Sequence, residues 1–139
     1  MHEHETDEQG RQICTTSGEA PSTVRAQQRA EGNTGQHGSY IVLCEEERQK
    51  GFVRPYRDAY KHVGRLERII SDGRERADQT HEYEHRVGGC GAVTTMGRAL
   101  SETYARDPHF YGFTFCCHCF AHFPVSEFVW TADGEQVGS

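Results

Sequence analysis

Apolar residues are unevenly distributed along the 139-residue chain, and their spacing separates a polar N-terminal part from a core-forming remainder. Residues 1–36 are rich in Glu, Gln, Thr, Gly and Ser and have no periodic apolar pattern. Such a segment cannot bury enough surface to offset the entropy lost on ordering. We therefore expect a disordered acidic tail over 1–36 and a small folded domain over 37–139.

Two helices and a first strand are predicted inside the folded part. Residues 39–44 form a short apolar run with β-branched residues, which is typical of a buried strand. Helical spacing of apolar residues follows Pro55 and continues to residue 70, and proline favours the first position of a helix. The polar residues 71–89 are expected to form a loop or a short exposed helix. A second helix is predicted over 94–107, where Asp107-Pro108 ends it.

The last part of the domain is predicted to be a β-hairpin. Residues 111–115 and 125–130 are rich in aromatic and β-branched residues and flank a cysteine-rich turn. The crowded aromatic side chains in this region are expected to pack a core, with a stacking platform for nucleobases as the alternative. Together these elements predict a small α+β domain with a zinc-knuckle hairpin, two helices and a disordered N-terminal arm.

Composition and charge narrow the classes of function. Hydrophobic residues make up 35% of the chain, no apolar run is long enough for a membrane span, and the N-terminus lacks the basic and apolar parts of a signal peptide. We expect a cytoplasmic protein. The net charge of −6 disfavours nucleic-acid binding, which needs clustered Lys and Arg. Seven basic residues gather over 54–76, but acidic residues alternate with them, so a solvated helix face is favoured over a partner-binding surface.

The cysteines carry the clearest chemical signal. The chain has six of them, namely Cys14, Cys44, Cys90, Cys116, Cys117 and Cys119. In a reducing cytoplasm, metal ligation is favoured over disulfide formation. Cys116 and Cys119 have the spacing with which a hairpin turn presents two thiolates to zinc, and glycines flank a third thiolate at Cys90. Cys117 points away from its neighbour in an extended segment, so we expect it to lie outside the site.

The fourth ligand is a histidine whose identity the pattern leaves open. We favour His85, which precedes Cys90 by five residues and could share its loop. His122, three residues after Cys119, and His62 are the alternatives. The resulting set is His85, Cys90, Cys116 and Cys119 around Zn. Two other interpretations of the cysteines are reduced buried side chains and a redox-active pair, and the strand-like flanks of the turn argue against the redox pair.

A second motif suggests a different chemistry. His81-Glu82-Tyr83-Glu84-His85 has the spacing in which two histidines on a helix hold zinc while the glutamate activates water. In metallopeptidases this motif sits in a packed amphipathic helix, whereas here it lies in a charged stretch that ends at Gly88-Gly89. We therefore favour a coincidental match and keep a zinc-dependent hydrolase as the alternative. No elbow or base motif points to a catalytic nucleophile, so no catalytic residue is assigned.

The segments CGAVTTMGRALSETYARDPHFYGFTFCCHCFAHFPVSEFVW and DGEQVGS, with GFVRPYRDAYKHVG as a weaker extension, resemble a group of small uncharacterised proteins of bacteria, phages and other mobile elements. The resemblance implies a compact zinc-ribbon-like or knuckle-containing domain in which Cys90, Cys116 and Cys119 match the family's cysteines. The family's histidine lies close before the first cysteine, and residues 65–89 look like an insertion, which leaves both His62 and His85 open. The family supplies no catalytic residue.

Four protein ligands would close the coordination sphere of the metal, so we expect the zinc to maintain the fold and the protein to act by binding. A protein partner with a basic surface suits the net charge, and a phage-type origin would suit a regulator or inhibitor of a host protein. The alternatives are the zinc hydrolase and a nucleic-acid-binding zinc module.

Overall fold

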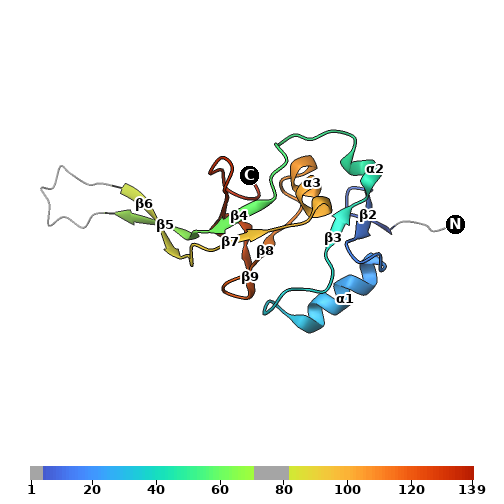
Figure 1. Ribbon diagram of the computed structural model, residues 1–139, viewed down its shortest axis with the longest axis horizontal. Helices are drawn as coiled ribbons and strands as arrows, with labels where there is room; N and C mark the ends of the chain where they lie inside the picture. The colour runs from blue at the N-terminus through green and yellow to red at the C-terminus, as the bar shows by residue number, and fades with distance from the viewer. Residues whose placement is uncertain (1–4, 71–81) are drawn as a thin grey trace, which may run out of the picture.

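The fold is a small α+β domain, as the sequence predicts, and the computed structural model describes residues 5–70 and 82–139. Its helices and antiparallel strands form an N-terminal layer, a central sheet and a cysteine-bearing hairpin, and a two-stranded arm projects from one end (Figure 1). Among the helices of the described residues, none has the length and apolar composition that crossing a membrane requires.

The N-terminal layer contradicts the expected disordered tail over residues 5–36. It consists of the strands β1 (Glu5–Thr6), β2 (Gln12–Thr15) and β3 (Ile41–Leu43), paired in the order β1-β2-β3, and the helix α1 (Pro21–Glu31). Ile13 and Val24 are 1% and 0% exposed. These few apolar side chains suffice because β2 pairs with β3 and α1 packs against both strands, so the layer folds without an amphipathic pattern of its own.

A disulfide joins Cys14 of β2 to Cys44, which follows β3. The sequence favours metal ligation for the cysteines as a group, and the structure instead divides them. The four others, all within the described residues, carry no disulfide. The cross-link spans 30 positions and ties the first strand pair to the start of the short helix α2 (Glu45–Arg48).

The central sheet contains β4 (Ala59–His62) between β7 (Val93–Thr95) and β10 (Phe128–Trp130), and all pairs are antiparallel. The helix α3 (Arg98–Arg106) occupies the position of the second predicted helix, and contacts of α3 with β3 and α2 connect it to the N-terminal layer. The main core cluster lies in this part of the molecule and contains Tyr60, Tyr104, Cys116, Phe128, Trp130 and Val137. Its aromatic members pack edge to face, as aromatic pairs in protein cores prefer.

The prediction of a helix from Pro55 to residue 70 is wrong, because this segment contains β4 and then β5 (Gly64–Ile70). Its buried residues Tyr60, His62 and Gly64 alternate with more exposed ones, which is the period of a strand. Gly64 has a φ of +89°, and a Cβ there would lie 2.3 Å from the carbonyl oxygen of Val87. The close crossing of the chain at this point therefore requires glycine.

The strand β5 pairs with β6 (Glu82–Gly88) to form the projecting arm, so part of the stretch expected as a loop is a strand (Figure 1). The predicted cysteine-rich hairpin is present as β8 (Phe113–Cys116) and β9 (Ala121–Pro124). Its return strand ends earlier than expected. The residues 125–130 form the turn η1 (Val125–Glu127) and then β10 in the central sheet.

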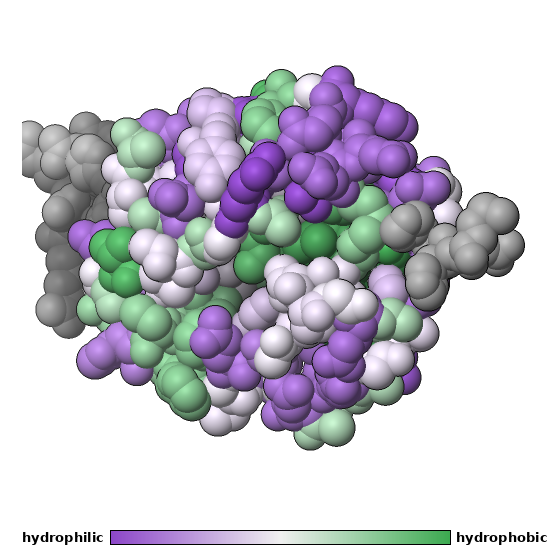
Figure 2. Space-filling model, turned by 45° about the vertical axis from the view of Figure 1, so that its right-hand side comes forward, coloured by the Kyte–Doolittle hydropathy of each residue, from purple (hydrophilic) through white to green (hydrophobic). Residues whose placement is uncertain are grey.

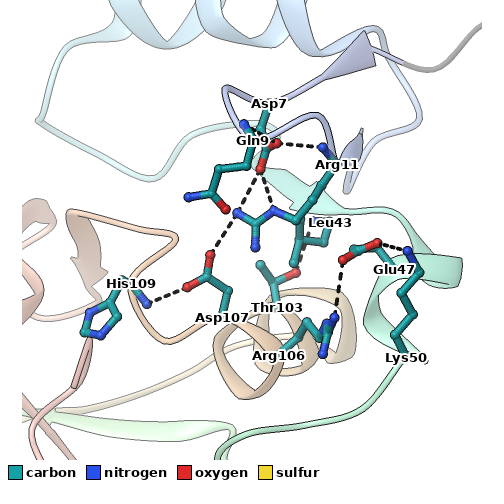
Figure 3. A network of polar contacts seen from close by, with 10 residues as sticks. All are labelled: Asp7, Gln9, Arg11, Leu43, Glu47, Lys50, Thr103, Arg106, Asp107 and His109. Carbon is teal, nitrogen blue, oxygen red and sulfur yellow. Dashed lines mark hydrogen bonds and ion pairs between the residues drawn. The ribbon is translucent and has the colours of Figure 1, made fainter.

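Polar contacts connect the N-terminal layer to the end of α3 (Figure 3). Arg11 contacts the carboxylates of Asp7 and Asp107 at 2.8 and 2.9 Å, so one guanidinium links the turn after β1 to the residue that follows α3. The hydroxyl of Thr103 accepts a hydrogen bond from the backbone N–H of Leu43 in β3. A guanidinium that bridges two carboxylates holds both segments in one geometry.

A further link is the buried ion pair between Arg48 of α2 and Glu102 of α3, with an N–O distance of 3.0 Å. Burial alone raises the pKa of Glu102, but hydrogen bonds from Arg48, Gln49 and Arg98 outweigh it and hold the pKa below its ordinary value of 4.5. The carboxylate form is therefore stabilised by the fold. Its contribution is complete at neutral pH and is lost as the pH falls through the lowered pKa.

We expect Glu102→Gln to lower the free energy of unfolding at pH 7 by about 2 kcal/mol, because it removes the charge that accepts these hydrogen bonds. The difference from the wild type should shrink as the pH falls below 4.5. Urea unfolding at pH 7 and pH 3 measures both effects. Glu46→Gln, on the exposed part of α2, is the matched control and should change neither value. A difference that persists unchanged at low pH would contradict the assignment to the charge.

Candidate metal centre

Four side chains from separate segments converge beside the central sheet. His62 ends β4, Cys90 lies in the loop between β6 and β7, Cys116 ends β8, and Cys119 lies in the following turn. The sulfur and nitrogen atoms that they offer all lie within 4.8 Å of one another. The Sγ atoms of Cys90 and Cys116 are 3.4 Å apart, and Sγ of Cys119 is 3.5 Å from Nδ1 of His62. A tetrahedral ion with metal–sulfur bonds of about 2.3 Å would place its sulfur ligands about 3.8 Å apart, so these distances suit one shared ion.

The hairpin turn presents its two sulfurs through its own backbone. The N–H of Phe120 donates to the carbonyl oxygen of Cys116, and the N–H of Cys119 points at the Sγ of Cys116 at 3.5 Å. Phe120 has a φ of 56°, the left-handed conformation that a side chain seldom adopts. The turn therefore presents Cys116 and Cys119 on one side and directs the amide of Cys119 at the sulfur of Cys116.

The loop that carries Cys90 is held against β4. The N–H of Gly91 donates to the carbonyl oxygen of His62, and the N–H of His62 donates to the carbonyl oxygen of Ala92. Gly91 has a φ of +76°, and the N–H of Ala92 points at the Sγ of Cys90 at 3.4 Å. The two segments that supply Cys90 and His62 are therefore fixed to each other by backbone hydrogen bonds as well as by the site.

The imidazole of His62 is oriented from its far side. Nε2 donates to Oε1 of Glu127 at 3.0 Å, because a carboxylate only accepts, and this leaves the lone pair of Nδ1 facing the sulfurs. The ring stacks on Phe123 and Phe128, and the residue is 1% exposed. A carboxylate that orients a histidine through its second nitrogen is the usual partner of a metal-ligating histidine.

Without a cation between them, the sulfurs compete for negative charge. Burial opposes charge at Cys90, but hydrogen bonds from the backbone N–H of Ala92 and from the thiol of Cys116 lower its pKa to about 6. Burial and the neighbouring sulfurs of Cys90 and Cys116 raise the pKa of Cys119 to about 12. One thiolate is thus favoured at neutral pH and suppresses the next. A divalent cation removes this conflict, because its positive charge stabilises several thiolates together.

Three of the four predicted ligands lie in this group, and the histidine differs from the favoured one. Cys90, Cys116 and Cys119 converge with His62, which was an alternative, and not with His85. His85 lies on β6 of the projecting arm, opposite Glu67, with its Nε2 3.9 Å from Oε2 of that residue. His85 is close to Cys90 along the chain, but β6 extends along the arm, so His85 lies away from the site.

The other alternative, His122, faces away from the sulfurs. It pairs with Phe115 across the hairpin, so it lies on the opposite face from Cys116. Its Nε2 accepts from the hydroxyl of Tyr40, and its ring stacks on His37 at a centroid distance of 4.2 Å. His122 therefore joins the hairpin to the N-terminal layer. The strand period of β4, which places His62 in register with buried Tyr60, is the signal that could have identified the ligand.

The remaining cysteine lies outside the group, as expected. Cys117 is exposed, its N–H donates to the hydroxyl of Thr94, and its Sγ lies 3.4 Å from the carbonyl oxygen of Val93. The pair Cys116 and Cys119 lies at a hairpin turn and not at a helix N-terminus, so the setting differs from that of a redox-active pair.

The metallopeptidase motif has a different geometry from the one its chemistry needs. Glu82 and His85 lie on the strand β6, and His81 lies outside the described residues. In a strand, residues four positions apart are separated by about 13 Å, whereas a helix brings them together on one face. The described part of the motif therefore lacks the helix that would place two histidines on one ion.

The basic residues of 54–76 do not form one helix face, because the described part of this segment is a loop and two strands. Arg57 is buried over the ring of Trp130 and pairs with Asp133, while Arg65 pairs with Glu67 on the arm. The aromatic residues of the last third mostly pack the core, as expected, but Phe113 and Phe120 are exposed.

Comparison of the chain with protein-family models, with curated proteins and with solved structures found no match.

We expect His62→Ala and Cys90→Ser each to weaken metal binding by more than about 100-fold, because each removes a ligand of the proposed set. His85→Ala and Cys117→Ser are the matched controls and should bind as the wild type does. Titration with cobalt(II), followed through the sulfur-to-cobalt charge-transfer band, measures affinity and the number of thiolates together. Loss of binding in His85→Ala, with His62→Ala unchanged, would show that the arm histidine is the ligand.

Glu127→Gln should lower metal affinity by about 10- to 100-fold, since the carboxylate both orients His62 and increases the basicity of its ring. The charge-transfer band should keep its intensity, because all three sulfurs remain. A competition titration against a chelator of known affinity measures the change. Glu135→Gln, on the exposed C-terminal turn, controls for the loss of one negative charge. Equal affinities in the two variants would rule out the positioning role.

Proposed function

We propose that His62, Cys90, Cys116 and Cys119 bind one zinc ion and that the zinc-stabilised domain is a non-enzymatic protein-interaction module. The observation that carries the proposal is the convergence of four ligand atoms within 4.8 Å from segments far apart in the chain. Three thiolates and one imidazole match the donor set of tetrahedral structural zinc sites. Soft sulfur ligands also disfavour magnesium, calcium and manganese, which prefer oxygen.

A structural role follows from the number of ligands. Catalytic zinc keeps one position open for water or substrate, whereas four protein ligands fill a tetrahedral sphere. The hydrogen bond from Nε2 of His62 to Glu127 suits a metal-ligating histidine. The hydrolase alternative has no support from the described residues, since its motif lies partly on a strand.

The metal supports the fold by joining three parts of the domain. The four ligands come from the central sheet, the loop at the base of the arm and the hairpin. Cys116 is part of the main core cluster, so the ion would lie at the edge of the core itself. Removing the ion would leave three sulfurs and an imidazole close together with opposing charge preferences, which destabilises this arrangement.

The segment between α2 and β4 offers a surface for a protein partner. Phe52, Val53 and Tyr56 are 44%, 56% and 47% exposed on one short stretch. This stretch is held in place, because the N–H groups of Val53 and Arg54 both donate to the carbonyl oxygen of Ala105. Exposed apolar side chains on a fixed backbone are typical of protein–protein interfaces. The net charge of −6 favours a partner with a basic surface.

We expect zinc removal with a high-affinity chelator to lower the unfolding midpoint by more than about 10 °C and to abolish partner binding in parallel. Affinity capture with the zinc-loaded protein, followed by binding measurements on the purified pair, identifies the partner. Val53→Asp should weaken that complex by at least about tenfold, because a charge in an apolar interface is costly to bury. Leu66→Asp, on the exposed arm, is the control and should bind normally.

An unchanged unfolding midpoint after complete chelation would contradict the structural role of the ion. A complex that forms equally well with Val53→Asp would contradict the assigned surface. Hydrolysis of a substrate by the zinc-loaded protein that is lost in His85→Ala would overturn the non-enzymatic assignment.

A further inference from the structure

A cleft of about 620 Å³ separates the N-terminal layer from the central sheet and α3. On one side lie the end of β2, the loop before β3 and the start of α2, and on the other side lie β7, the beginning of α3 and β8. Figure 2, in which the side of the N-terminal layer comes forward, shows hydrophobic surface between hydrophilic rims on this face. The volume is in the range of small-molecule binding sites in proteins.

The cleft exists because the two sides touch at separated points. The hydroxyl of Tyr40 donates to His122, and the hydroxyl of Tyr111 donates to the carbonyl oxygen of Ile41. The first bond anchors the loop before β3 to the hairpin formed by β8 and β9. The second anchors β3 to Tyr111, which precedes that hairpin. Between them, side chains line the space without filling it.

Aromatic rings form much of the lining. They come from both sides and include Tyr40, Tyr60, Tyr104, Tyr111, Phe113 and Phe115. Phe113 is 54% exposed, which leaves part of its ring accessible to a ligand at the cleft. Tyr60, Tyr104 and Phe115 are buried, so Phe113 offers the most accessible face for offset stacking against a planar molecule.

The charged groups of the lining are already paired. Arg48 contacts Glu102 at 3.0 Å, and Arg98 contacts Glu102 at 3.3 Å and Glu45 at 4.0 Å. His37 contacts Glu31 at 3.1 Å. A strongly charged ligand would therefore compete with existing ion pairs, whereas an uncharged one would leave them intact. Exposed Gln36 and Thr95 supply an amide and a hydroxyl that can hydrogen-bond to polar atoms of a ligand.

We propose that this cleft binds a small, uncharged, planar aromatic molecule that carries hydrogen-bonding groups. The ligand stacks on the accessible ring of Phe113 and is oriented by the polar side chains of the rim. The site is separate from the metal centre, because none of its lining residues is a proposed metal ligand.

Benzamide and cyclohexanecarboxamide are a matched pair of probes, since both carry the same neutral amide and only benzamide is planar and aromatic. We expect benzamide to shift the backbone amide NMR signals of Thr95 and Phe113 saturably in the zinc-loaded protein, with cyclohexanecarboxamide causing little change. Phe113→Ala should weaken benzamide binding by about tenfold through loss of stacking. Phe52→Ala removes another exposed phenylalanine, 44% exposed and outside the cleft, and should leave benzamide binding unchanged.

Equal shifts with both compounds, or no saturable shift with benzamide, would overturn the proposal. It would also fail if Phe113→Ala and Phe52→Ala changed benzamide binding equally. Metal content and the unfolding midpoint of each variant are measured first, so that a loss of benzamide binding is not confused with a loss of zinc. Wild-type zinc content and stability without benzamide binding would thus contradict this inference and leave the proposed function standing.

Discussion

The fold depends on one cluster of side chains in which neighbouring groups oppose each other's ionisation. Three sulfurs and an imidazole lie within 4.8 Å of one another, and without a cation the thiolate of Cys90 opposes ionisation of Cys119. The fold nevertheless brings them together through backbone hydrogen bonds between β4 and the Cys90 loop and through the tight turn of the hairpin. A divalent cation at this point would remove the conflict, because its positive charge stabilises several thiolates together.

His122 joins the N-terminal layer to the hairpin formed by β8 and β9. One face of the hairpin presents Cys116 to the metal centre, and the other presents Phe115 and His122 to the N-terminal layer. Because Nδ1 of His122 contacts the carbonyl oxygen of Asn33 while Nε2 accepts from Tyr40, both ring nitrogens are used. The contacts of His122 thus help to position the N-terminal layer against the hairpin. The layer in turn forms one wall of the aromatic cleft.

Errors in the sequence-based predictions have a common physical origin. Apolar residues between Pro55 and residue 70 recur at helical intervals, yet Tyr60 and His62 alternate as in a strand, and pairing with β7 and β10 decides for the strand. Residues 5–36 have too few apolar positions to predict folding, but Ile13 and Val24 are buried where β2, β3 and α1 pack together. His85 is close to Cys90 in the chain and distant in the fold. In each case partners far away in the sequence outweigh local preference.

The sequence by itself determined the α+β class, the second helix, the cysteine-rich turn and the three cysteines of the candidate metal centre, because spacing within a turn and strong local patterns do not depend on distant contacts. Only the tertiary structure decided the histidine, the disulfide between Cys14 and Cys44, the order of the N-terminal layer and the aromatic cleft. These features join segments that are far apart in the chain. Their geometry follows from strand pairing and the close crossing at Gly64, which no local pattern encodes.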